Sequence, residues 1–284
     1  MAITQQRRSL SRRSGLTLME LLVVVVILIA LGGILAPLLP NMLQKGHIAQ
    51  TVTNVTEIDK AMQAYQTANL AYPDYFDSLV AGSGFYSAGP FLNATFSGIN
   101  GSTPSFTVGQ LTQGQVDSLN EAMAGTSLNL TATQTTSGVH LVPMNSAPTD
   151  ATFDAYAVNA NGVLTLPAIQ AGQSVAVAND NFIWNVLQAR QPTDLQGNSR
   201  AIFIALGLGP YCTIVGNHSF GIAAAPICFG EVQSENPKNS YARMICIFRV
   251  YNDGTRAEYV GSAHPGHDGL GTAADHIQEY FSTN

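Results

Sequence analysis

A single carboxylate inside the longest apolar run of the chain is the residue best placed to do specific chemistry. Between Leu16 and Leu39 the only ionisable side chain is that of Glu20. A carboxylate in hydrocarbon costs at least ~2.5 kcal/mol, so such residues usually mark a function and pair with another group.

The run itself predicts a transmembrane and assembly helix over residues 16–39. About 20 residues at a rise of 1.5 Å cross the ~30 Å hydrocarbon layer of a bilayer. Four arginines lie between residues 7 and 13, and no acid precedes Glu20. Because basic flanks stay on the cytoplasmic side, we expect the rest of the chain to be exported. A secretory signal peptide fits less well, because its cleavage site would follow the apolar region, whereas Gly15 precedes it.

The segment Gly15-Leu16-Thr17-Leu18-Met19-Glu20 resembles the leader junction of type IV prepilins and of the related pseudopilins. In that superfamily a basic leader ends in a glycine, and a glutamate stands five residues past the cut. The resemblance implies that residues 1–15 are a leader, which a prepilin peptidase removes by cutting between Gly15 and Leu16 before it N-methylates Leu16. The cut would create a free amine at a helix start, where unpaired N–H groups carry partial positive charge. Pairing Glu20 with the Leu16 amine of a neighbouring copy would then remove two buried charges at once, so the resemblance also implies that Glu20 acts in assembly. The similar region covers roughly residues 7–65.

Two prolines, Pro37 and Pro40, are expected to break or loosen the helix, and Pro37 falls where many pilins carry such a proline. Residues 40–69 are predicted to be the amphipathic half of the same helical spine. Apolar residues recur there at intervals of three and four, at Ile48, Val52, Val55, Ile58, Met62 and Tyr65. We therefore expect one long N-terminal spine, with a membrane half and an amphipathic half.

Residues 70–284 are predicted to form a globular, pilin-like head of the α+β class, whose antiparallel sheet packs on the spine. The strongest strand patterns are residues 200–206 and 242–251. The second leads through Asn252-Asp253-Gly254-Thr255 into a strand at 256–260, which is typical of a β-hairpin. A helix is predicted over 112–124 with Thr112 as its N-cap. Weaker patterns indicate an irregular loop at 72–107, strands at 128–135, 151–158 and 162–166, and helices at 181–190, with Trp184 in the core, and 273–281.

Three cysteines, Cys212, Cys228 and Cys246, lie in the last third of the chain. Export permits a disulfide, and each of the three pairings leaves one thiol over. The resemblance to pilins with a C-terminal disulfide loop implies a covalent link that hardens the exposed end of the head. No C-x-x-C occurs, so no metal site is expected at the cysteines, and no histidine-rich partner set marks one of them as catalytic.

The densest polar cluster contains His264, His267 and Asp268. Histidine-x-x-histidine followed by aspartate is a weak candidate for a metal site, and an exposed turn is the simpler interpretation. No P-loop, dinucleotide-binding glycine motif or nucleophile elbow occurs. We therefore predict no metal, no cofactor and no enzymatic activity.

The amino-acid composition limits the kinds of molecule that the protein is expected to bind. Of the 284 residues, 46% are hydrophobic and 11% are charged. Loss of the four leader arginines would leave eight basic against 18 acidic residues, a formal charge of −10. Nucleic-acid binding needs clustered lysine and arginine to neutralise phosphates, so nucleic acid is an unexpected partner.

Together with the resemblance, these patterns predict a structural subunit of a type IV pilus or pilus-like filament. Its size favours a specialised or minor pilin. The expected partners are other pilins in a homo- or hetero-polymer, the prepilin peptidase and the inner-membrane assembly machinery. We expect a single-pass precursor in a bacterial inner membrane, with its N-terminus in the cytoplasm, and later a place in the pilus, at the cell surface or in the periplasm. Two alternatives stay open: a type II secretion pseudopilin, and a minor pilin whose head is an adhesive or DNA-binding module.

Overall fold

The fold is known from a computed structural model of the chain. It describes residues 18–35, 39–81, 84–85, 106–123, 138–142, 168–179, 183, 187, 189–194, 196–216, 221–226, 243–266 and 269–271. The chain divides into two compact units, Met1–Gly46 and His47–Asn284. We call the second the globular unit, and the two are taken separately below.

The prediction of one long N-terminal helical spine packed on an antiparallel sheet was wrong. Helix α1 (Leu18–Leu35) ends before helix α2 (Leu39–Asn69) begins, and most of α2 belongs to the other unit. Among the described residues, no helix has both the length and the apolar character needed to cross a bilayer. The predicted membrane half over residues 16–39 is therefore not found either.

Pro40, one of the two predicted breaks, lies at the start of a helix and not inside one. A proline disfavours helical geometry in the residue before it and cannot donate a backbone hydrogen bond. Pro40 lies in the first turn of α2, where its missing N–H costs nothing. Pro37, the other predicted break, lies outside the described residues.

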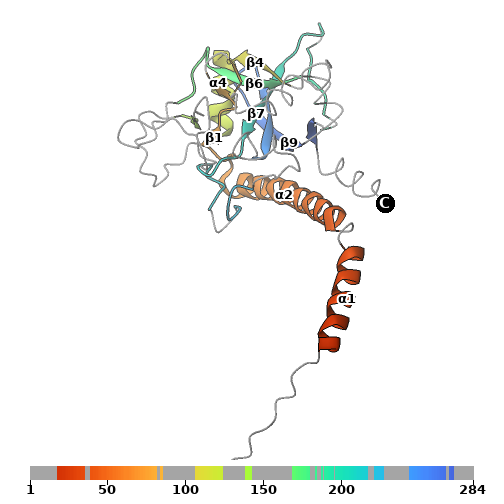
Figure 1. The fold of residues 1–284 in the computed structure, drawn as a ribbon. Coiled ribbons are helices and arrows are strands. Elements are labelled where there is room, and N and C mark those ends of the chain that lie inside the picture. The colour runs from red at the N-terminus through yellow and green to blue at the C-terminus, as the bar shows by residue number, and fades with distance from the viewer. Residues whose placement is uncertain are drawn as a thin grey trace, which may run out of the picture. The chain divides into compact units, whose positions relative to one another are not determined.

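A sheet of eight strands, seen in Figure 1, forms the centre of the globular unit. Strand β7 (Ala201–Gly207) pairs in antiparallel fashion with β8, and it also pairs with β6 and with one residue of β1. The sheet is not purely antiparallel as predicted, because β1 pairs with β5 in parallel. The other strands of the sheet are β1 (Phe76–Asp77), β4 (Phe106–Gln110), β5 (Leu141–Val142), β6 (Ser174–Ala178), β8 (Ile245–Tyr251), β9 (Ala257–Gly266) and β10 (Gly269–Gly271). A separate pair consists of β2 (Val80–Ala81) and β3 (Gly84–Phe85).

Both faces of the sheet are buried. Alternate residues of a strand point to opposite faces, and each set belongs to its own core cluster. On one face, Phe248 and its strand neighbours share a core cluster with α2. On the other, Phe203 and Ile247 belong to a second cluster, which includes Tyr75 and Ile183. This double burial explains why β7 and β8 are apolar along nearly their whole length, a pattern that the sequence shows plainly.

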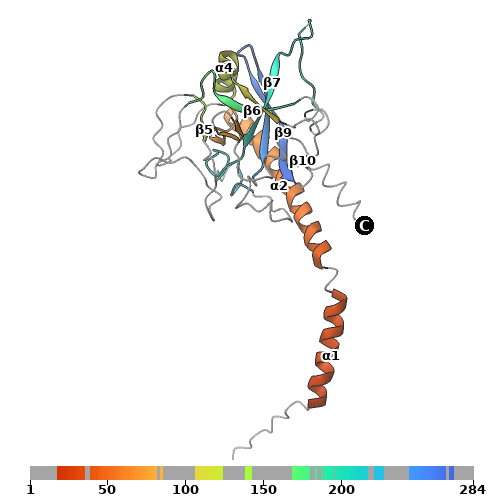
Figure 2. The ribbon, with the colours of Figure 1, turned by 45° about the horizontal axis from the view of Figure 1, so that its top comes forward.

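The apolar stripe predicted on residues 48–65 is confirmed for the residues nearest the sheet. Val55, Ile58, Met62 and Tyr65 are each at most 4% exposed and belong to the cluster that contains Phe248. Each residue follows the last by three or four positions, so all four lie on one side of α2. Figure 2 shows α2 alongside the sheet.

Helix α4 (Gln113–Ala122) confirms the helix predicted over 112–124. Thr112 is its N-cap and forms a full capping box with Gln115. The amide of Gln115 also donates to Asn252 Oδ1 at 2.7 Å, which ties the start of α4 to the β8–β9 turn. At Gly114, a Cβ would stand 2.0 Å from the carbonyl oxygen of Asn252, so only glycine fits this approach.

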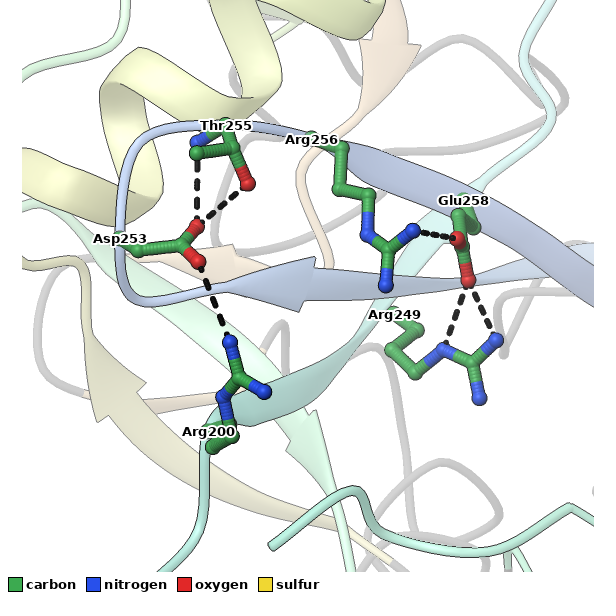
Figure 3. Close-up of polar contacts among 6 residues, drawn as sticks. All are labelled: Arg200, Arg249, Asp253, Thr255, Arg256 and Glu258. Atoms are coloured by element: carbon green, nitrogen blue, oxygen red, sulfur yellow. Dashed lines mark hydrogen bonds and ion pairs between the residues drawn. The ribbon is translucent and has the colours of Figure 1, made fainter. Parts of the chain in front are cut away.

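The predicted hairpin between β8 and β9 is confirmed, with β9 extending to Gly266. Gly254 has φ +79°, a conformation that favours glycine. Figure 3 shows Asp253 accepting hydrogen bonds from the N and Oγ1 of Thr255 at 3.1 and 2.6 Å, with Arg200 3.7 Å away. In the same view Glu258 lies between Arg249 and Arg256.

Several predicted elements lie outside the described residues. They are the strands at 128–135, 151–158 and 162–166, the helix at 273–281, and Trp184. The sequence reading missed β4 and β6, which pair with each other over five residues. Both are short, and their small or polar residues give only a weak alternation.

Candidate functional site

Helix α1 is the candidate functional site, because it carries apolar side chains on every side and leaves them exposed. Exposed fractions of its large apolar residues run from 43% at Val25 to 82% at Leu18. An amphipathic surface helix would show a polar face, and α1 shows none. A helix that is apolar all round is normally covered by protein or by lipid.

The sequence of α1 is poor in intrinsic helix formers over its middle. The run Val23–Val26 consists of β-branched residues, which lose side-chain freedom in a helix. A helix nevertheless pairs the backbone groups between its two ends within the segment, which an apolar environment requires. The residue choice therefore fits a helix meant to be surrounded by apolar partners.

Glu20 lies in the first turn of α1 and is exposed. A carboxylate there interacts favourably with the partial positive charge of the helix start. Gly15 and Leu16, the predicted cleavage and methylation positions, lie outside the described residues. The predicted pairing between Glu20 and a Leu16 amine therefore stays a prediction.

The predicted C-terminal disulfide has no support at two of its three candidates. Cys212 and Cys246 are free thiols, both buried in the core cluster under α2. Burial raises the pKa of each thiol, since the thiolate would lose its hydration. Both are therefore unreactive packing residues, whereas Cys228 lies outside the described residues.

Of the three weak metal candidates, the structure describes only His264. His264 is in β9, where its backbone is paired with Gly271 of β10, and His267 and Asp268 lie outside the described residues. Within the described part of the chain, no group of three or more histidine, cysteine or acidic residues could hold a metal ion.

The sequence reading missed a buried acid–histidine pair next to β1. Asp74 and His140 are 0% and 2% exposed, and Asp74 Oδ2 lies 3.1 Å from His140 Nδ1. Asp74 Oδ1 accepts from the backbone N–H groups of Tyr75 and His140, at 2.7 and 2.8 Å. The N–H of Asp74 donates to Thr213 Oγ1 at 3.0 Å. The hydrogen bonds of the pair tie together three segments that are far apart in the sequence. Because both side chains are buried, the pair offers no access to a substrate.

Tyr75 lies over this pair in an unusual conformation. Its φ is +65°, and its ring stacks on that of His140 at 5.2 Å between centroids. Its hydroxyl is buried, with no hydrogen-bond partner among the residues that the structure describes. Burial, helped by the charge of Asp74, raises the pKa of Tyr75 to about 12. No local sequence pattern marks these residues, because the contacts join positions up to 139 residues apart.

A second polar cluster fastens α2 to the sheet. Asp59 Oδ1 accepts hydrogen bonds from the hydroxyls of Tyr259 and Ser262. The bond from Ser262 Oγ is 2.8 Å long. Ser262 Oγ also lies 3.4 Å from the carbonyl oxygen of Val55. Desolvation, with the nearby Cys246 and Asp59, holds the pKa of Tyr259 well above its usual value, so its hydroxyl stays a donor. The cluster fixes where α2 lies along β9.

Comparisons with known proteins add no relative: no protein-family model, no curated protein and no solved structure matches this chain. The resemblance to type IV prepilins therefore rests on the residues of the leader junction alone.

Proposed function

We propose that this protein is a structural subunit of a type IV pilus-like filament, in which α1 packs against the α1 helices of other copies. The observation that supports the proposal best is the exposure of apolar side chains on all sides of α1. Burying one such side chain fully is worth about 1.5–3 kcal/mol. The helix has a dozen exposed large apolar residues, so association has a strong driving force.

The globular unit supports the same proposal in a different way. Its core is closed on both sheet faces, and its buried acid–histidine pair has no access for a substrate. A stable unit joined to a helix of exposed apolar side chains is suited to building an assembly.

In the proposed maturation, a prepilin peptidase cuts between Gly15 and Leu16 and N-methylates Leu16, and Glu20 then meets the Leu16 amine of a neighbouring copy. The pairing explains why a carboxylate is kept in an otherwise apolar segment. It would also set the axial position of one copy against the next, because a charge pair tolerates little displacement in an apolar surrounding.

The test is mass spectrometry of the mature protein together with filament assembly by the full chain in its native host. We expect a mature N-terminus at Leu16 and sheared filaments that contain the protein. Glu20→Ala should abolish or sharply reduce filaments while the protein level stays normal. Glu57→Ala is the matched control, because Glu57 is an exposed carboxylate on α2. A mature protein that begins elsewhere, or normal filaments from Glu20→Ala, would refute the proposed pairing.

A further inference from the structure

We draw no further inference here: the strongest candidate, the charged surface patch that Arg249, Arg256 and Glu258 form beside the ring of Tyr251 on the β8–β9 hairpin (Figure 3), carries nothing, because Glu258 already pairs with both arginines and nothing in the structure shows what covers the patch.

Discussion

The two N-terminal helices follow one another in sequence, yet their apolar residues have opposite fates. In α1 every large apolar side chain named above stays at least 43% exposed. In α2 the stripe from Val55 to Tyr65 is at most 4% exposed against the sheet. The difference lies in pattern: α1 is apolar all round, whereas α2 confines its apolar residues to one side. In the proposed function, α1 would pack against other copies, whereas α2 packs on the sheet of its own chain.

The substitution with the largest expected effect on stability tests this contrast by comparing two methionines of α2. Met62 is 0% exposed in the core, whereas Met42 is 70% exposed. Met62→Ala should lower the free energy of unfolding by about 2–5 kcal/mol, because it removes buried methylenes and leaves a cavity. Met42→Ala should change it by less than about 0.5 kcal/mol. Denaturant unfolding measures both. Equal effects of the two substitutions would show that the apolar stripe is not what holds α2.

Sequence patterns were sufficient where contacts are local or periodic. The capping box of α4, the Asp253-Gly254 turn and the stripe on α2 each follow from residues a few positions apart. The continuous spine was wrongly predicted, because the apolar run and the stripe suggested one helix although two prolines lie between them. A proline is compatible with either a kink or a break, and periodicity does not choose between them.

The polar clusters of the globular unit could not be predicted from such patterns. Asp74 joins His140 and Thr213, and Asp59 joins Tyr259, across 66 to 200 positions of sequence. Nothing near Asp59 distinguishes it from any polar residue on the outer side of α2. Of the candidate site, the apolar character of α1 and the position of Glu20 in it were predictable.

A test with an intermediate expected effect asks whether α2 is held on the sheet by the polar cluster at Asp59 as well as by its apolar stripe. Tyr259→Phe removes one of the two hydroxyl donors to Asp59 and leaves the ring in place. Because hydrogen bonds to charged groups contribute about 1.5–3 kcal/mol, the free energy of unfolding should fall by about that amount. Thr53→Ala is the control, since the Thr53 hydroxyl bonds the Ala49 carbonyl on the exposed side of the same helix and should matter little. Unchanged stability of Tyr259→Phe would assign the attachment of α2 to apolar packing alone.

The smallest expected effect sharpens the contrast between side chains that serve the chain and side chains that serve partners. The ring of Tyr75 packs on His140, while its buried hydroxyl has no hydrogen-bond partner in the described part of the chain. Tyr75→Phe keeps the ring and removes the unsatisfied group, so the free energy of unfolding at pH 7 should rise, by about 1 kcal/mol.

The same substitution should change the alkaline limb of stability. The pKa of Tyr75 is about 12 in the folded chain against an ordinary 10, so the folded state holds its proton longer than the unfolded state. Its contribution is complete below about pH 10 and is lost as the pH rises toward 12. Tyr75→Phe should therefore flatten the fall in stability over that window, and Tyr259, whose pKa is also raised, should account for part of the fall that remains. Unfolding by denaturant at pH 8 and at pH 11 measures the difference. An equal fall in both proteins would mean that the Tyr75 hydroxyl reaches solvent, and that the strained backbone of Tyr75 is not compensated by burial.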